Sequence, residues 1–371
     1  MKIEIERSEL LKPVSRVQSI IERKSSMPVL STVLFEASGS NVRLSATDLE
    51  LGFQEIIPAQ IVQEGSVTIS GRKLFEILKE SKTERFIIEK KENNWVFIFD
   101  GVARFDLASI SPDEFPTFIE PEGVATVEME AETLADMINK TIYAVTMEEA
   151  GFKLSGVFTE KVSIGGRSFL RMVATDGHRL SLIDKPVSDV DVLELGKGVM
   201  IPRKGMSELN RLASEGERVE IGFKEKECVA RQNNALLVIR LLETKFPDYQ
   251  AVIPDESPFP ISLKRSSLLE GMRKMLILSN ERYRAVKITL ESGILDLVST
   301  NPDLGEGQEK IEVEFTGERV EAGFNPRYFV DVLQSMESEI ITMEFTDSAK
   351  PCVLKGEADQ GFTGLIMPMR V

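Results

Sequence analysis

The residue best suited to acid–base chemistry in this sequence is His178, the only histidine, which lies two positions after Asp176 and directly before Arg179. A histidine beside a carboxylate can act as a general base. No serine elbow, reactive-cysteine pairing, Walker loop or dinucleotide fingerprint accompanies it. We therefore predict no catalytic residues and interpret these residues as an Asp-Gly turn that places His178 on a strand edge. A general-base site is the alternative.

Residues that could hold a metal or a disulfide are also few. Asp189 and Asp191 form a D-x-D pattern that could bind a cation, but without further ligands a solvated turn is favoured. Cys228 and Cys352 are too few and too far apart for a zinc site or a disulfide framework. The sequence thus predicts no metal, no cofactor and two inert thiols. The segment 305–308, which contains two glycines, is interpreted as a turn.

A buried strand that leads directly into a helix occurs three times in the chain. Its copies align Arg72, Arg203 and Arg327, each with a leucine six positions later (Leu78, Leu209 and Leu333). An aspartate precedes each arginine by 24 to 27 residues (Asp48, Asp176 and Asp303). An apolar residue followed by proline comes 40 to 43 residues after each arginine (Phe115–Pro116, Phe246–Pro247 and Met367–Pro368). A repeat of about a third of the chain has the size of a small domain with its own core.

Each repeat is predicted to contain a strand, a helix, several strands, a second helix and further strands. The fold class is therefore α+β, with three tandem domains that each pack two helices on antiparallel sheet. Helices are expected at 8–24, 72–82, 131–146, 202–214, 264–279 and 326–338. Two linkers, the first rich in proline and acidic residues, set the domains at 1–120, 121–252 and 253–371. Pro13 is awkward for the first helix, because a proline in a helix interior removes a hydrogen bond.

Charge is unevenly distributed along the chain. The net charge is −15, yet the predicted helices are net positive and the remainder is net negative. Helices on one face of each domain would present a basic surface that suits sequence-independent phosphate contacts. The alternative is that the helices use Lys and Arg only as good helix formers. No apolar run approaches 18 residues and the first residues form an amphipathic strand, so we expect a cytoplasmic protein without a membrane partner.

Four motifs, together with the threefold repeat, indicate a known family. They are Met27–Ser31, Ala174–Leu180, Phe246–Tyr249 and Met367–Arg370. Together they resemble the bacterial DNA sliding clamps, the beta subunits of DNA polymerase III, along the whole chain. The resemblance implies a homodimeric ring, joined head to tail, whose helices surround double-stranded DNA without sequence preference. It also implies a non-catalytic role and association with the nucleoid during replication. A size estimate agrees with two chains. Twelve helices from two chains, packed about 10 Å apart, would enclose a bore of roughly 28 Å, which admits a DNA duplex, whereas the six helices of one chain would enclose only about 9 Å.

The resemblance also assigns residues to three kinds of contact. It places DNA contacts on Lys24, Arg72, Lys73, Arg203 and Lys204, with Lys24 where the family often has arginine. The ring joint would use Phe105, Ile277 and Leu278, which could equally be ordinary core.

The third contact implied by the resemblance is a groove for short hydrophobic motifs. These motifs would come from the DNA polymerase III alpha subunit, the clamp-loader delta subunit, other polymerases and repair proteins. Its walls would be Leu154, Thr175, Gly177, His178, Arg179, Leu180, Pro247, Val252, Asn325, Tyr328, Met367, Pro368, Met369 and Arg370. Ala251 stands where some members carry arginine. Without the resemblance these residues would be interpreted as core and C-terminal strand, and the chain could be a scaffold that binds only proteins.

Overall fold

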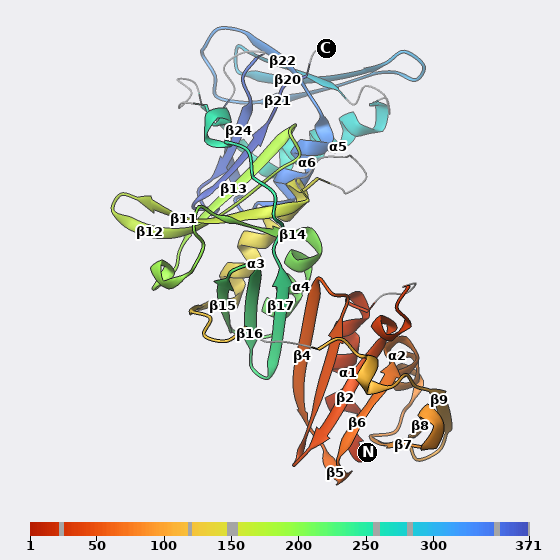
Figure 1. Ribbon diagram of the computed structural model, residues 1–371. Coiled ribbons are helices and arrows are strands. Elements are labelled where there is room, and N and C mark those ends of the chain that lie inside the picture. The colour runs from red at the N-terminus through yellow and green to blue at the C-terminus, as the bar shows by residue number, and fades with distance from the viewer. Residues whose placement is uncertain are drawn as a thin grey trace. The chain divides into compact units, whose positions relative to one another are not determined.

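The structure, a computed structural model, describes residues 1–21, 26–117, 121–146, 155–254, 260–279, 285–344 and 349–369. The chain forms two compact units (Figure 1). Unit 1 comprises Met1–Ala131, Val192–Glu194 and Arg211–Leu241, and unit 2 comprises Glu132–Asp191, Leu195–Asn210 and Leu242–Val371. The middle third of the sequence therefore contributes to both units.

Unit 1 contains two antiparallel sheets together with helices α1 (Arg7–Arg16) and α2 (Gly71–Glu80). The five-stranded sheet has the order β5-β1-β7-β8-β9, with strands Gln60–Gln63, Lys2–Glu6, Arg85–Lys90, Trp95–Phe99 and Arg104–Ala108. The eight-stranded sheet has the order β10-β15-β16-β17-β4-β3-β2-β6, with strands Thr126–Glu130, Arg218–Lys224, Glu227–Gln232, Ala235–Arg240, Leu51–Pro58, Asn41–Thr47, Thr32–Ser38 and Gly65–Ser70. Strands of the first and second repeats thus form one continuous sheet, joined where β17 pairs with β4.

Unit 2 has the same plan. Its eight-stranded sheet has the order β14-β11-β12-β13-β25-β24-β23-β18, with strands Val199–Pro202, Gly156–Ile164, Arg167–Thr175, Arg179–Pro186, Phe362–Ile366, Cys352–Gly356, Ile340–Glu344 and Ile261–Lys264. The four-stranded sheet has the order β21-β20-β19-β22, with strands Gly305–Glu312, Ile294–Asn301, Val286–Glu291 and Val320–Phe324. The helices α3, α4, α5 and α6 span Ala131–Asn139, Arg203–Ala213, Arg265–Leu278 and Pro326–Ser335. Here β13 and β25 join the second repeat to the third.

Apolar periodicity explains why these segments adopt these forms. In β1 the alternate residues Ile3 and Ile5 are buried, as expected for a strand with one face on the core. In α2, Leu74 and Leu78 lie one turn apart and are fully buried, whereas Arg72 and Lys73 are exposed. The basic residues of this helix therefore face solvent because its apolar stripe faces the sheet.

The threefold repeat predicted from the sequence is confirmed by equivalent backbone hydrogen bonds. The first residue of the first helix in each repeat donates its N–H to a glutamate carbonyl that precedes a strand. The pairs are Arg7 with Glu84 at 2.6 Å, Ala131 with Glu217 at 2.9 Å and Arg265 with Glu339 at 2.9 Å. The three repeats are thus the same fold in the same register.

The structure corrects several predicted elements. Helix α1 ends at Arg16 and is followed by a 3-10 turn at Val17–Ser19, so the prediction of α-helix is wrong over residues 17–21. Residues 22–24 of that prediction lie outside the described residues. Pro13 lies buried inside α1. Helix α3 likewise ends at Asn139 rather than at residue 146. The turn predicted at 305–308 is instead the start of β21, where Gly305 has φ +114 and pairs with Asn301.

The two cysteines are buried free thiols, as predicted. Burial raises the pKa of both Cys228 and Cys352, so the reactive thiolate is disfavoured. Within the described ranges no group of three or more His, Cys, Asp or Glu residues could hold a metal ion. None of the helices described there is both long and apolar enough to cross a bilayer.

Candidate functional site

The hairpin between β12 and β13 carries five of the predicted groove residues, Thr175 and Gly177–Leu180. Asp176 accepts the backbone N–H groups of His178 at 3.0 Å and Arg179 at 3.1 Å. Thr175 accepts the N–H of Gly177 at 3.1 Å, and Gly177 has φ +85, which favours glycine. The predicted Asp-Gly turn is thus present, and its carboxylate holds the backbone.

His178 lies exposed at the tip of this turn and stacks on an aromatic side chain of the third repeat. Its ring centroid is 6.3 Å from that of Tyr328, with an interplanar angle of 14°. The other oxygen of Asp176 accepts from Nε of Arg179 at 3.0 Å. The acid beside His178 is therefore engaged in turn geometry, which agrees with a contact surface and not with a general base.

Arg179 links the second and third repeats within unit 2. Its Nη1 donates to Asp331 of α6 at 2.6 Å and its Nη2 donates to the Tyr143 carbonyl at 2.6 Å. The guanidinium also lies over the rings of Tyr328 at 4.7 Å and Tyr143 at 5.4 Å. Burial raises the pKa of Tyr143 to about 12, so its phenol stays neutral. Because the planar guanidinium of Arg179 is hydrogen-bonded at its edge and stacked on its faces, it fixes β13 against α6.

Helix α6 supplies the next predicted wall residues. Asn325 caps it, since its side-chain oxygen accepts the N–H of Arg327 at 3.0 Å. This cap sets the first turn, on which Tyr328 reaches the His178 and Arg179 side chains.

The end of the chain runs between these elements. The N–H of Met367 donates to the His178 carbonyl at 2.8 Å, and the N–H of Met369 donates to the Gly323 carbonyl at 2.7 Å. Residues 367–369 therefore bridge the turn before β13 in the second repeat and β22 in the third. The side chain of Met369 keeps 37% of its surface exposed, which leaves a flexible apolar group available for contact.

An apolar cluster lies beneath this surface. It comprises Val173, Leu180, Leu182, Met200, Phe246, Tyr249, Val353 and Leu365, with Phe158, Leu242 and Ile253 partly buried against it. Phe158 and Phe246 stack at 4.8 Å. Arg171 donates to the Tyr249 hydroxyl at 3.0 Å and so holds the segment that carries the exposed Pro247 and Val252.

The structure thus brings together Thr175–Leu180, Asn325, Tyr328 and Met367–Met369 by direct contacts. Pro247 and Val252 lie on the segment anchored by Phe246 and Tyr249. Leu154, Lys24 and Arg370 lie outside the described residues. The sequence did not identify Tyr143 and Asp331 as part of this surface, because their contacts with Arg179 span 36 and 152 positions of the chain.

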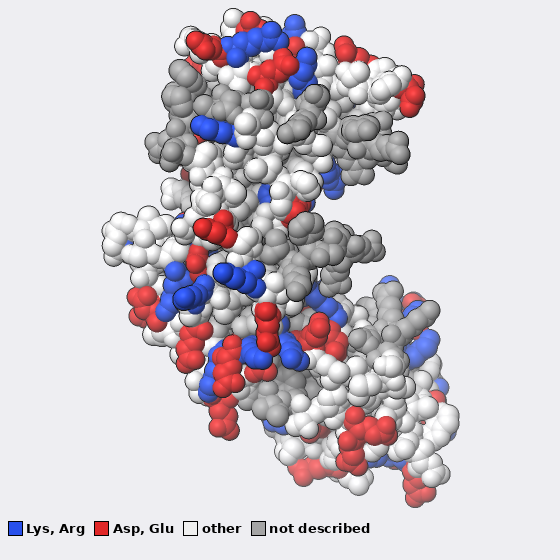
Figure 2. Space-filling model, turned by 45° about the horizontal axis from the view of Figure 1, so that its top comes forward, with Lys and Arg blue, Asp and Glu red and all other residues white. Residues whose placement is uncertain are grey.

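Four of the predicted DNA contacts, Arg72, Lys73, Arg203 and Lys204, lie at the starts of equivalent helices. Arg72 and Lys73 open α2 with side chains 69% and 60% exposed, and each bonds Glu76 at 2.8 Å. Hydrogen bonds from Lys73 and Arg72 lower the pKa of Glu76, which keeps it ionised. Arg203 and Lys204 open α4 in the same way. On the strands, charges are also paired, as for Arg218 with Glu128 and Glu130, and Figure 2 shows both signs interspersed on the face that it draws.

The predicted joint residues lie on two separate elements. Phe105 is half-buried on β9, while Ile277 and Leu278 end α5 with Ile277 75% exposed. Leu278 also packs against β21, since its Cδ1 would lie 2.9 Å from a Cβ placed on Gly307.

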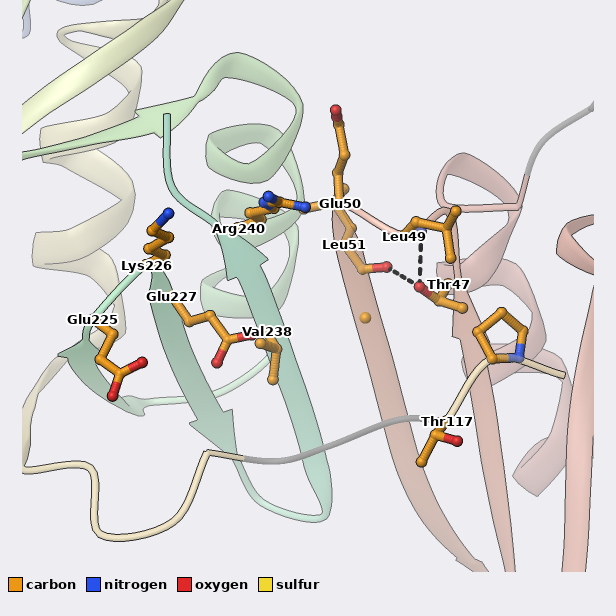
Figure 3. A pocket seen from close by; sticks show the side chains of 12 residues that line it. Thr47, Leu49, Glu50, Leu51, Thr117, Glu225, Lys226, Glu227, Val238 and Arg240 are labelled. Atoms are coloured by element: carbon orange, nitrogen blue, oxygen red, sulfur yellow. Dashed lines mark hydrogen bonds between the residues drawn. The ribbon is translucent and has the colours of Figure 1, made fainter. Parts of the chain in front are cut away.

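A second hairpin of the same construction lies in unit 1 at Asp48, which the sequence aligns with Asp176, but the cavity beside it was not predicted. Thr47 donates to the Leu51 carbonyl at 2.8 Å and accepts the N–H of Leu49 at 3.0 Å, as drawn in Figure 3. Beside it is a cavity of about 410 Å³ whose lining includes Pro116, Glu227 and Arg240. Glu50 and Leu51 occupy the places of His178 and Arg179, so this copy lacks the arginine that organises the hairpin of unit 2.

Comparison with known proteins covers the whole chain. Family models of the DNA polymerase III beta subunit match residues 1–119 with the N-terminal domain, 128–248 with the central domain and 250–370 with the C-terminal domain. A beta sliding clamp of Caulobacter vibrioides is 32% identical over 374 residues, covering 100% of both chains. A solved Caulobacter crescentus DNA polymerase sliding clamp is 32% identical with a TM-score of 0.93, covering 100% of both chains. A Bartonella birtlesii sliding clamp, solved bound to griselimycin, is 31% identical with a TM-score of 0.94 and the same coverage.

Proposed function

Because the chain belongs to the DNA polymerase III beta subunit family, the beta sliding clamps, we propose that it encircles duplex DNA and tethers the replicative polymerase to it. The match of three successive family domains along the full length carries this assignment. Such a clamp is not itself an enzyme. Its work is topological, because a ring that surrounds a duplex can slide along it but cannot dissociate sideways.

A ring of two chains joined head to tail is supported by the strand edges. In the first two repeats, the strand that follows the aligned aspartate (Asp48 or Asp176) pairs with the last strand of the next repeat: β4 with β17, and β13 with β25. The equivalent strands that remain are β21 of the third repeat and β9 of the first. Among the described residues, β21 pairs only with β20 and β9 only with β8. Pairing β21 of one protomer with β9 of another would repeat the internal joint and close the ring.

Contact with DNA is assigned to Arg72, Lys73, Arg203 and Lys204, with Lys24 as a further contact. The pairing of Arg72 and Lys73 with Glu76 supports weak binding of DNA. A phosphate that binds either cation must displace the Glu76 carboxylate from it. Replacing one exposed ion pair by another yields only a small net free energy of binding. Contacts to phosphates alone carry no sequence preference, which suits a protein that must slide.

Partner proteins are assigned to the surface formed by Thr175–Leu180, Asn325, Tyr328 and Met367–Met369, together with Pro247 and Val252. Leu154 and Arg370 complete the proposed groove. An exposed methionine and an exposed valine on a rigid frame suit a short hydrophobic motif. The proposed ligands are motifs of the polymerase alpha subunit, the clamp-loader delta subunit, other polymerases and repair proteins. The boundaries 1–120, 121–252 and 253–371, and a cytoplasmic location at the nucleoid, are proposed on the same family basis.

Retention on DNA of different topology tests the function. The protein, loaded onto nicked circular DNA by a clamp loader, should stay bound through gel filtration and leave after a restriction enzyme linearises the circle. Blocking both ends of the linear DNA with bound protein should restore retention. Equal loss from the circular and linear forms would contradict encirclement.

A further inference from the structure

Three equivalent cations mark the joints between repeats. Arg16, Lys140 and Lys274 each lie nine positions after the first residue of the first helix in their repeat, at Arg7, Ala131 and Arg265. The matching backbone hydrogen bonds of those first residues fix the equivalence. The three cations therefore occupy the same location in three copies of one fold.

The first two cations bind a carboxylate of their own repeat and another of the next repeat. Arg16 donates to Glu55 of its own repeat at 2.5 Å and to Glu215 of the second repeat at 2.9 Å. Lys140 bonds Asp136 of its own repeat at 2.5 Å and Asp359 of the third repeat at 2.9 Å. Both cations are buried, with side chains 10% and 1% exposed. Each internal joint is therefore closed by a cation shared between two repeats.

Lys274 binds a carboxylate of its own repeat but none of a following repeat in the described part of the chain. It bonds Glu309 of its own repeat at 2.8 Å, on β21, and its side chain is 57% exposed. The repeat that would follow the third one belongs to another copy of the chain in a head-to-tail ring. The second carboxylate for Lys274 must then come from the first repeat of that copy.

The first repeat contains the counterpart of Asp359. Asp359 lies in the turn between β24 and β25, the last hairpin of its repeat, and accepts the Ser338 hydroxyl at 2.6 Å just beyond α6. Asp100 lies in the turn between β8 and β9, the last hairpin of the first repeat, and accepts the Ser81 hydroxyl at 2.7 Å just beyond α2.

The two aspartates differ in one respect. Asp100 is only 6% exposed, and its bonds to the described residues are to Ser81 and to the N–H groups of Val102 and Ala103. Asp359 makes comparable bonds and has Lys140 in addition. In the described part of the chain no Lys or Arg forms an ion pair with Asp100, so the place that Lys140 fills beside Asp359 is available to a cation from a second copy.

Exposed apolar side chains surround both halves of this joint. The three most exposed large apolar residues among those described are Val102 at 83%, Ile277 at 75% and Leu304 at 68%. Val102 lies beside Asp100 in the same turn, Ile277 follows Lys274 on α5, and Leu304 precedes β21. Burial against a second copy would remove all three from water and lower the dielectric constant around the ion pair.

We propose that Lys274 of one protomer forms an ion pair with Asp100 of the partner subunit at each of the two joints of the ring. This pair rests on the proposed head-to-tail ring and repeats the arrangement of Lys140 with Asp359. The partner of Arg16, Glu215, differs in that it follows α4 and does not lie in the last hairpin of its repeat. Glu309 holds the ammonium in position, and Ser81 with the turn N–H groups holds the carboxylate, so little ordering is needed when the two copies meet.

A double-mutant cycle on the dissociation of the full-length dimer tests the pair. Lys274→Gln and Asp100→Asn should each raise the dimer dissociation constant about a hundredfold, because two joints each lose roughly tenfold. The double variant should be no weaker than the weaker single variant. Lys355→Gln, which breaks a half-buried pair with Glu344 inside the third repeat, is the control and should leave the constant unchanged.

The outcomes distinguish failure of the proposed ion pair from failure of the proposed ring. A wild-type chain that stays monomeric at every concentration would overturn the ring itself. A wild-type dimer whose two single effects simply multiply in the double variant, or whose Lys274→Gln form is unaltered, would overturn the pair and leave the ring. If Asp100→Asn does not fold, Lys274→Glu replaces it in the test, since it keeps the Asp100 turn intact. It should dissociate more readily than Lys274→Gln because two carboxylates would then face each other, and equal dissociation of the two variants would overturn the pair.

Discussion

Lys140 and Asp359 form an ion pair that is almost fully withdrawn from water, with Nζ 2.9 Å from Oδ1 and side chains 1% and 0% exposed. The pair joins the end of α3 in the second repeat to the last hairpin of the third. Asp359 in turn accepts the N–H groups of Glu337 and Ser338 at 2.9 and 3.0 Å. One carboxylate thus holds both the preceding repeat and the segment that follows α6.

Lys140→Met should therefore destabilise the protein by about 3–5 kcal/mol, because it leaves Asp359 buried without its cation. Urea unfolding followed by circular dichroism measures the change in the free energy of unfolding. Lys197→Met, at an exposed lysine of the same repeat, is the control and should change it by less than about 0.5 kcal/mol. Equal stability of the two variants would show that the pair contributes nothing.

The same pair predicts how stability depends on pH. Burial alone would raise the pKa of Asp359, but the Ser338 hydroxyl, the Glu337 N–H and the Lys140 ammonium lower it below its ordinary 3.8. Burial alone would lower the pKa of Lys140, but Asp136 and Asp359 raise it above 10.5. The stabilisation should be complete between about pH 4 and 10, lost as pH falls through the lowered pKa of Asp359 and lost as pH rises through the raised pKa of Lys140. Wild type and Lys140→Met, unfolded in urea at several pH values, should converge outside that window and differ within it.

Arg179→Lys should weaken the binding of a short hydrophobic polymerase peptide by about tenfold while leaving the dimer intact. A lysine keeps the charge but cannot bond Asp176, Asp331 and the Tyr143 carbonyl at once or lie flat on Tyr328. Fluorescence anisotropy of a labelled peptide measures the affinity. Arg167→Lys, at an exposed arginine on β12, should bind as the wild type does, and unchanged binding by Arg179→Lys would remove this residue from the frame of the site.

Deletion of residues 367–371 should abolish peptide binding but spare dimerisation. The deletion removes the exposed Met369 and the hydrogen bonds to His178 and Gly323, whereas β9, β21 and α5 remain. Sedimentation and peptide anisotropy on the same sample report the two properties separately. A truncated protein that still captured the peptide would refute the proposed groove.

Arg72→Glu combined with Arg203→Glu should shorten retention on circular DNA, and the loss should grow as salt is lowered, because repulsion of phosphate is least screened there. Retention half-life on nicked circles at 50 and 200 mM salt provides the measurement. Arg218→Glu combined with Arg319→Glu, at two arginines paired with glutamates on or beside strands, is the control with the same change in net charge. If the control shortened retention as much as the double variant, net charge and not the helix starts would govern DNA contact.

The regular elements were predictable wherever apolar spacing marked them. Helices α2, α4, α5 and α6 begin within a residue of the prediction, because Pro326 and the strand-to-helix transitions define their starts. Strand β21 was missed because its inner face is only half-buried and consists of Gly307, Glu309 and Ile311, of which only Ile311 is apolar. The end of α1 was overestimated because Val17 and Ile21 continue the apolar stripe through the 3-10 turn.

The site itself was predictable only in part. The turn at Asp176 and Gly177 follows from local residue types. The role of Arg179 as a link to Asp331, and the buried Lys140–Asp359 pair, depend on contacts between repeats that no local pattern specifies. The sequence located the repeats, and only the fold revealed that equivalent positions in them carry shared cations.

The central claim is that two chains close around DNA. Cysteines introduced at Val102 and Leu304, on the two faces of the proposed joint, would be joined by a short thiol cross-linker after loading onto circular DNA; the buried Cys228 and Cys352 should not react. The account predicts a covalent ring that stays on the circle in denaturant and falls off once the DNA is cut. Release from the intact circle in denaturant, despite complete cross-linking of both joints, would contradict it.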